Sequence, residues 1–390
     1  MTARAMTMMR RLGDVAPSSA AANPQGDSVW MLNLDQVEAQ TGRVLSHLKV
    51  SRQSVGQSTN AFDEENVLYC KLRPYLNKVV LPNGGGFATS ELVPLRPDPK
   101  ALDRRYLTHF LRSSKFVAWA SKKTAGAKMP RLSMDQFWDY QIPILGLPEQ
   151  RRIADILDQA DALRRKQQKA DLLADDLIHA LFLDIFGNPV QNPKGWNTGT
   201  LRDLIEDIEA GWSAKGEDRP LEPKEMGVLR VSAVTSGVYK PEEAKAVSDL
   251  QGRSVIVPKK GDLLFSRANT KELVAATCLI HEEDLHVFLP DKLWRLIPRK
   301  GRATTAFLKY LISFPRFRWT IASKATGTSG SMLNISQDKV LETPCIIPPH
   351  DLMQRFHRAV FEIAEVRIQQ HKAIECGHGA FDSLSQQFFG

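Results

Sequence analysis

The chain has 390 residues, 43% of them hydrophobic and 25% charged, and its formal net charge is +8 with a pI near 9.2. This length exceeds one ordinary hydrophobic core, so we expect at least two domains. The sequence has no apolar run of roughly 18 residues and no apolar signal-peptide centre near its start, which argues against a membrane or secreted protein. The four cysteines form no CxxC pair, so we expect a cytoplasmic protein without a zinc ribbon or disulfide framework.

The first expected globular unit spans residues 1–147. Within it, residues 66–72 (NVLYCKL) predict a strand with alternating apolar positions, and residues 81–87 (LPNGGGF) predict a hairpin turn.

A single long helix is predicted over residues 148–187. Pro148 and Glu149 suit a first turn, because proline loses no useful N–H there and a carboxylate faces the positive end of the helix dipole. Gly187, followed by Asn188 and Pro189, is a stop signal. Apolar residues recur along one narrow stripe, which favours a coiled-coil partner. The stripe comprises Ile153, Ile156, Ala160, Leu163, Ala170, Leu173, Leu177, Leu181 and Ile185.

The second expected unit, residues 188–349, repeats the plan of the first. The chain therefore reads as a tandem duplication in which each α/β unit precedes a long helix. Three pairs of segments align at offsets near 200 residues: 66–72 with 262–268 (DLLFSRA), 105–111 (RYLTHFL) with 306–312 (AFLKYLI), and 115–137 with 316–340.

Residues 350–390 predict the second long helix, in which Gly377 and Gly379 favour a kink or a looser stretch. Gln167 and Gln370 interrupt the two apolar stripes at equivalent positions. If the helices pair antiparallel, these glutamines can face each other and fix the register. The predicted fold class is α/β (α+β), with two tandem globular units separated by two long helices that form an antiparallel coiled coil.

The basic excess lies in the globular units. Residues 1–147 carry a net charge of +7 and residues 188–349 carry +4, whereas the two helical segments are slightly acidic. This distribution disfavours a basic membrane-surface helix. Two positive units on a nearly neutral spacer suit duplex DNA, where phosphate contacts give affinity and base-edge contacts give sequence choice.

Candidate DNA contacts occupy matching places in the two units. Arginine and asparagine follow the matching strands, and these residue types read guanine and adenine edges. Serine and glycine let a backbone approach a phosphate. For any single one of these residues, a solvated surface charge is the commoner explanation. The candidates are Lys71, Arg73, Lys122, Lys123, Lys128 and Arg131 in the first unit, and Arg267, Asn269, Arg316, Arg318, Lys324, Ser329 and Ser331 in the second.

No sequence signature of catalysis is present. The patterns GxGxxG, GxxxxGK[ST] and GxSxG do not occur. We therefore predict no catalytic residue and no metal site in this chain. We expect instead a binding subunit that works with a catalytic partner.

The run from Leu147 to Pro189 resembles the central conserved helix of type I restriction-modification specificity (S) subunits. The shared features are a proline, then Glu-Gln-Arg-Arg-Ile-Ala, then a helix ending in Phe-Gly-Asn-Pro. The duplicated organisation of the whole chain strengthens the resemblance. The second helix departs from the pattern, with LMQRFHRA in place of the first run. The resemblance implies target recognition domains at 1–147 and 188–349, and conserved helices at 148–187 and 350–390.

The resemblance also implies the partners, which are double-stranded DNA, two methyltransferase (M) subunits and restriction (R) subunits. S-adenosylmethionine, ATP and Mg would belong to those subunits, with no cofactor in this chain. Each target recognition domain would read one half of a split DNA site, and the helix length would set the unread spacer.

Two alternatives stay open from the sequence. A fused restriction-methylation specificity protein with its own nuclease activity would need a cluster of metal-binding carboxylates. A two-headed scaffold that holds protein partners would lack the steep salt dependence of DNA binding.

Overall fold

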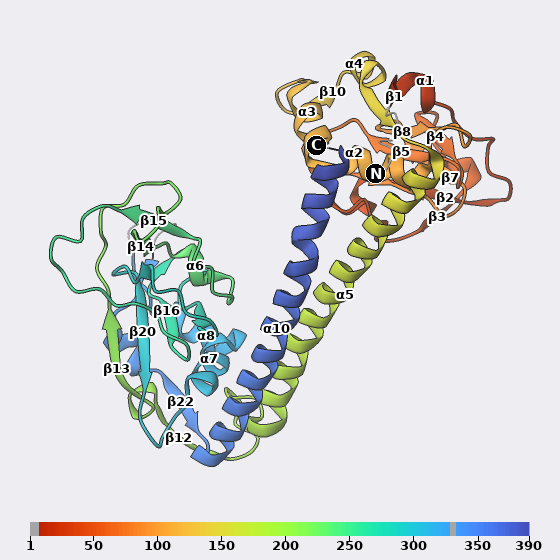
Figure 1. Cartoon of the computed structure of the whole chain (residues 1–390). Helices are drawn as coiled ribbons and strands as arrows, with labels where there is room; N and C mark the ends of the chain where they lie inside the picture. The colour runs from red at the N-terminus through yellow and green to blue at the C-terminus, as the bar shows by residue number, and fades with distance from the viewer. Residues whose placement is uncertain (1–7, 328–332, 390) are drawn as a thin grey trace. The chain divides into compact units, whose positions relative to one another are not determined.

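The computed structural model describes residues 8–327 and 333–389, without the side chains of residues 373–387. The chain divides into two units, here called unit 1 (residues 1–167 with 372–390) and unit 2 (residues 168–371) (Figure 1). The division passes through both long helices, so each unit holds a globular part and a stretch of each helix. None of the described helices combines the length and apolar character needed to cross a lipid bilayer.

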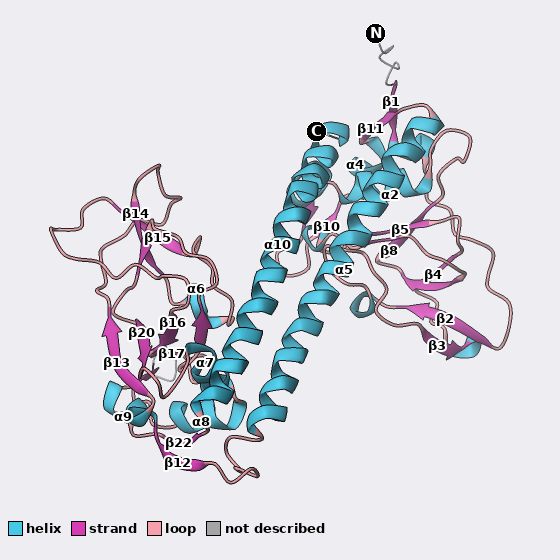
Figure 2. Ribbon diagram, turned by 60° about the horizontal axis from the view of Figure 1, so that its bottom comes forward, coloured by secondary structure: helices cyan, strands magenta, loops and turns pink. Residues whose placement is uncertain are grey.

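The globular part of unit 1 contains a four-stranded sheet of order β3-β2-β7-β4, a three-stranded sheet of order β6-β5-β8, and the two-stranded sheets β1-β11 and β10-β9 (Figure 2). Its main core lies between the β6-β5-β8 sheet and the neighbouring helices, and it includes buried aromatic residues such as Tyr106, Phe116 and Phe137. The elements are β1 (Met8–Arg11), α1 (Leu12–Val15), β2 (Ser28–Leu32), β3 (Leu48–Ser51), β4 (Thr59–Phe62), β5 (Val67–Cys70), β6 (Val79–Val80), β7 (Gly86–Thr89), β8 (Leu92–Leu95), α2 (Arg104–Arg112), α3 (Ser114–Lys122), β9 (Thr124–Ala125), β10 (Arg131–Leu132), α4 (Met134–Asp139) and β11 (Gln141–Ile144).

The globular part of unit 2 is built in the same way, with sheet orders β13-β20-β16-β18 and β15-β14-β19. Its main core includes the buried Phe265, Trp294 and Phe307. The elements are β12 (Asn197–Thr200), β13 (Ile205–Ala210), β14 (Met226–Leu229), α6 (Ser232–Thr235), β15 (Ala244–Val247), β16 (Leu263–Ser266), β17 (Ala268–Asn269), β18 (Thr277–Leu279), β19 (Val287–Phe288), β20 (Leu293–Pro298), α7 (Thr305–Ser313), α8 (Pro315–Ala322), β21 (Leu333–Asn334), α9 (Gln337–Leu341) and β22 (Pro344–Ile347).

The internal topology of the two units follows the repeat in the sequence. In each unit the first strand pairs antiparallel with the strand just before a long helix: β1 with β11, and β12 with β22. The helix pair α2–α3 corresponds to α7–α8, and α4 corresponds to α9. Corresponding strands and helices therefore follow one another in the same order in both units.

Two local expectations are wrong. The strands β5 and β16 are buried at all four positions rather than alternately, because each lies between two neighbouring strands and is covered on both faces. The glycines at 84–86 do not close a hairpin, since β6 pairs with β5 whereas β7 pairs with β2 and β4. Gly86 instead begins β7, where a Cβ atom would lie 2.6 Å from the Trp30 carbonyl oxygen.

The two long helices are α5 (Leu147–Phe186) and α10 (His350–Phe389), each of 40 residues. Gly187 follows α5 with a φ of 75°, which is the left-handed conformation that ends many helices. The helix α10 continues through Gly377 and Gly379 without a break. The kink or looser stretch expected there stays a prediction.

The two helices lie side by side in each unit, and they run antiparallel in unit 2. In unit 2, the rings of Phe356 and Phe182 are 5.6 Å apart, and Arg367 lies beside Asp171. In unit 1, the Arg152 guanidinium lies 5.9 Å from the centre of the Phe388 ring. The residue number therefore rises along α10 as it falls along α5. The register pair of Gln167 and Gln370 stays a prediction.

The buried face of α5 differs from the predicted stripe. Leu163, Leu173 and Leu177 are exposed. The prediction considered only a partner helix, but α5 also packs against the globular parts of both units, and those contacts select a different face. The buried apolar residues are Ile153, Ala154 and Leu157 in unit 1 and Ile178, Phe182 and Phe186 in unit 2.

Candidate nucleic-acid interface

The turn after β5 lies against the β9–β10 hairpin. The Arg73 backbone N–H donates to the Pro130 carbonyl oxygen at 2.7 Å. Leu72 pairs with Arg131 in an isolated antiparallel bridge, and the Arg73 Nη2 atom lies 3.4 Å from the Lys128 carbonyl oxygen. Two stretches that are more than 50 residues apart in the sequence thus form one surface.

Arg73 is held in an uncommon backbone conformation. Its φ of 50° and ψ of 62° place it in the left-handed region, just before the short 3-10 helix Pro74–Leu76. For a residue with a Cβ atom, this conformation costs roughly 1 kcal/mol or more of free energy. The hydrogen bond to Pro130 helps to fix it, and the exposed side chain of Arg73 then lies along the hairpin, with its guanidinium beside the Lys128 carbonyl oxygen.

Four exposed cations surround this surface. Lys122 and Lys123 lie at the end of α3, next to the hairpin that carries Lys128, and Arg73 lies on the facing turn. In residues 8–327 and 333–389, no carboxylate lies within salt-bridge distance of these four side chains. We call Arg73, Lys122, Lys123 and Lys128 the basic hairpin patch; unpaired cations of this kind are available to phosphates.

Arg131 and Lys71 are situated differently. Arg131 donates from Nε and Nη2 to one Glu91 oxygen, at 2.9 and 2.8 Å, and this hydrogen bonding raises the pKa of Arg131. Lys71 is half-buried, and its backbone bonds to Glu91 and Leu132. Both residues lie beside the patch, but the charge of Arg131 is already compensated.

Sequence reasoning did not single out two apolar side chains beside the patch. Tyr75 is 48% exposed and Met129 is 47% exposed. Both occur in the same short stretches as the cations, CKLRPYL and AKMPR. Their position among basic residues was the feature of the sequence that could have identified them as candidate contacts. Apolar groups among phosphate-binding cations can contact base edges such as the thymine methyl group.

Unit 2 repeats this junction of turn and hairpin. Ala268 pairs with Asn334 as Leu72 pairs with Arg131 in unit 1. The Arg267 guanidinium lies 5.7 Å from the centre of the Trp294 ring and 3.9 Å from Asp291.

Asn269 lies two residues after Arg267, at the end of the short strand β17. Its Oδ1 atom accepts from the Thr270 N–H at 2.8 Å. Its Nδ2 atom has no hydrogen bond within the described part of the chain, so this amide retains a donor that can contact a base edge.

The remaining candidates in unit 2 divide into two groups. Arg316 is exposed on α8, one turn from Trp319, which is 65% exposed and was not singled out from the sequence. Arg318 and Lys324 instead bind within the unit, Arg318 to the Glu272 carbonyl at 2.7 Å and Lys324 to the Thr343 hydroxyl at 2.9 Å. Burial lowers the pKa of Arg318.

Ser329 and Ser331 lie outside the described residues. Within residues 8–327 and 333–389, no group of three or more histidine, cysteine, aspartate or glutamate side chains is arranged to hold a metal ion.

Residues 8–173 match the family model described as the type I restriction modification DNA specificity domain. Two similar curated proteins are specificity subunits of type I restriction enzymes from Escherichia coli. The EcoEI subunit is 25% identical over 163 residues, which cover 41% of this chain and 27% of that protein. The EcoDI subunit is 23% identical over 195 residues, which cover 47% of this chain and 43% of that protein. The matched region therefore spans less than half of either relative.

The fold is also similar to solved structures. A crystal structure of the S subunit of a type I restriction-modification system from M. genitalium aligns with a TM-score of 0.64 and 12% sequence identity. The alignment covers 100% of this chain and 98% of that one, so the likeness of fold extends over both units. These comparisons favour neither the nuclease nor the scaffold alternative.

Proposed function

We propose that this chain is the DNA-recognition subunit of a type I restriction-modification system, because residues 8–173 match the DNA specificity domain of that family and two curated specificity subunits are similar to the chain. Each globular part would read one half of a split target. The observation that carries this proposal is the repeated junction of a strand-end turn with a hairpin, which presents Arg73 in unit 1 and Asn269 in unit 2.

Recognition at this junction would combine two kinds of contact. The basic hairpin patch would bind phosphates, which supplies affinity without sequence choice. Tyr75 and Met129 in unit 1, with Asn269 in unit 2, would face base edges and supply the choice. Because Arg318 and Lys324 are bound within unit 2, they would support the interface rather than contact DNA.

The chain would be non-catalytic and would act in the cytoplasm with other subunits. Two methyltransferase subunits and the restriction subunits would bring S-adenosylmethionine, ATP and Mg. This chain would contribute the choice of sequence and the spacing between half-sites.

The proposal is tested by expressing the full chain with a candidate methyltransferase subunit and sequencing the methylated DNA. We expect a bipartite motif that disappears when the chain is omitted. Tyr75→Ala should relax one half of the motif and Asn269→Ala the other, whereas the exposed Lys100→Ala should change neither.

Methylation that does not depend on the chain would refute the proposal. A single variant that altered both half-sites would refute the assignment of one half-site to each unit.

A further inference from the structure

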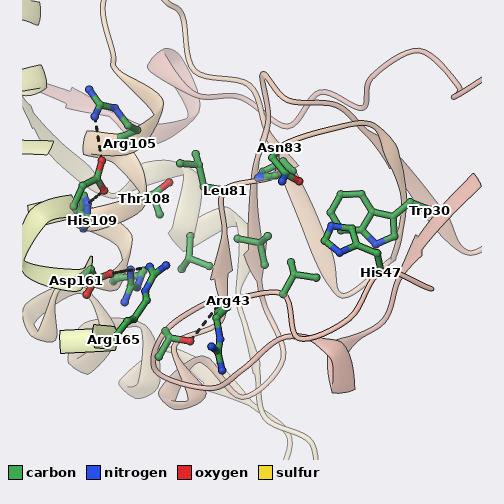
Figure 3. A pocket seen from close by; sticks show the side chains of 18 residues that line it. Trp30, Arg43, His47, Leu81, Asn83, Arg105, Thr108, His109, Asp161 and Arg165 are labelled. Carbon is green, nitrogen blue, oxygen red and sulfur yellow. Dashed lines mark hydrogen bonds and ion pairs between the residues drawn. The ribbon is translucent and has the colours of Figure 1, made fainter. Parts of the chain in front are cut away.

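Unit 1 contains a cavity of about 370 Å³ that the proposed function does not use. Its walls are the loop of residues 41–47, residues 79–83 around the end of β6, and the facing sides of α2 and α5 (Figure 3). None of the candidate DNA contacts lines it. The volume lies within the usual range for small-molecule sites.

Positive charge gathers at one end of this cavity. Asp161 is almost fully buried and has three arginines within salt-bridge distance: Arg112 at 2.9 Å, Arg164 at 3.1 Å and Arg165 at 3.7 Å. Of these three, Arg112 and Arg165 line the cavity, so one carboxylate faces two guanidiniums there. The second carboxylate of the wall, Asp158, is paired with Arg105 at 3.0 Å and with His109 at 2.8 Å. Arg43 also lines the cavity, although Glu38 compensates its charge at 3.0 Å.

Two buried donors in the cavity wall lack acceptors. The Arg112 Nε atom and the Trp30 Nε1 atom are both buried without a hydrogen-bond partner in the described part of the chain. Trp30 as a whole is only 8% exposed. A buried donor without a partner is unfavourable, and both donors belong to residues that line the cavity.

The ends of the cavity differ in chemistry. Figure 3 shows the Trp30 and His47 rings at one end, Asp161 and Arg165 at the other, and Arg43 between them. The ring centres of Trp30 and His47 are 4.4 Å apart. The site therefore offers guanidinium donors at one end and an aromatic surface at the other.

The loop that closes the cavity contains two residues with positive φ angles. Gly42 has a φ of 67°, and a Cβ atom there would lie 1.8 Å from the Val79 carbonyl oxygen, so no other residue fits without displacement. Gln40 has a φ of 64°, and its carbonyl accepts from Arg112 Nη2 at 3.3 Å. Strained residues of this kind gather at ligand sites.

We propose that this cavity binds a small molecule bearing a phosphate or pyrophosphate group. The phosphate oxygens would accept hydrogen bonds from Arg112, Arg165 and Arg43. Guanidinium groups suit this role because their planar N–H donors match phosphate oxygens in pairs. The aromatic end would hold the uncharged part of the molecule. The proposal stands independently of DNA recognition.

The experiment is calorimetric titration of the full chain with sodium pyrophosphate at constant ionic strength. We expect saturable binding at one site. Arg165→Gln should weaken it about tenfold, because one charge-assisted contact is lost. Arg165 has a side chain that is 51% exposed, so the substitution leaves the core intact.

The matched control is Arg151→Gln, which removes the same charge from α5 at a residue that does not line the cavity. It should change the affinity by less than about twofold if the binding is local rather than a response to net charge. Absence of saturable binding, or equal weakening by both variants, would overturn the proposal. DNA binding is measured on the same samples, so failure here is distinguishable from failure of the proposed function.

Discussion

Arg367 of α10 and Asp175 of α5 form an ion pair of 2.7 Å between Nη1 and Oδ1, joining the two long helices within unit 2. Asp175 is 55% exposed, so this bond contributes little by itself. The neighbouring aromatic residues bury far more surface. Phe356 contacts Phe182 and Phe186 at ring distances of 5.6 and 5.5 Å.

The first prediction concerns that aromatic contact. Phe356→Ala should destabilise the protein by roughly 3–5 kcal/mol, since it leaves a cavity where the two helices meet. Urea unfolding of the full chain measures the change. Val366→Ala, on the same helix at a residue that is 54% exposed, should shift stability by less than about 0.5 kcal/mol. Similar losses for both variants would show that the aromatic contact is not what stabilises this pairing.

The second prediction concerns the buried Asp161. Asp161→Asn should cost roughly 3 kcal/mol at neutral pH, because it leaves Arg112 and its neighbours without their carboxylate. Asp135→Asn, an exposed substitution on α4, serves as the control. A loss no larger than that of the control would contradict this account.

The pH dependence of that loss follows from the pKa of Asp161. Burial raises this pKa, but the attraction and hydrogen bond of Arg112, with Arg164 nearby, outweigh burial and hold it below the usual 3.8. A carboxyl with a lowered folded-state pKa stabilises the protein above its unfolded pKa and loses this effect as pH falls through the folded value. The difference between wild type and Asp161→Asn should be constant from about pH 5 to 7 and shrink below about pH 4.

The third prediction concerns the basic hairpin patch. Lys122→Gln and Lys128→Gln should each weaken DNA binding with little change of sequence preference, and each should reduce the slope of log K against log salt by about one. Lys100→Gln removes an exposed charge outside the patch and should leave the slope unchanged. Salt titrations of a fluorescent duplex measure these slopes. An unchanged slope in the double variant would place the phosphate contacts elsewhere.

The fourth prediction concerns the long helices. Seven residues inserted within 160–170 of α5, with a matching insertion in α10, should lengthen the tolerated DNA spacer by about three base pairs. This follows because seven helical residues span about 10 Å and each base pair about 3.4 Å. Methylome sequencing reads the spacer directly. Insertion into α5 alone should abolish recognition, and any change in the half-sites themselves would rule out the helices as the spacer.

The sequence by itself determined the order of elements and their duplication. The offset of 203 residues relates α4 to α9, β11 to β22 and α5 to α10. Proline near the start of α5 and glycine after its end fixed that helix within one residue at each end. Such features are readable because they depend on contacts between near neighbours in the chain.

Only the tertiary structure decided which side chains are available at the candidate interface. Lys128 and Arg131 belong to one short stretch, yet Lys128 is unpaired whereas Arg131 meets Glu91 from a distant strand end. Lys324 was an equally plausible contact, but the Thr343 hydroxyl holds it. The face that α5 buries was decided in the same way, by the globular parts packed against it. Local periodicity specifies an element, whereas the partner of a charge or an apolar face depends on segments that folding brings together.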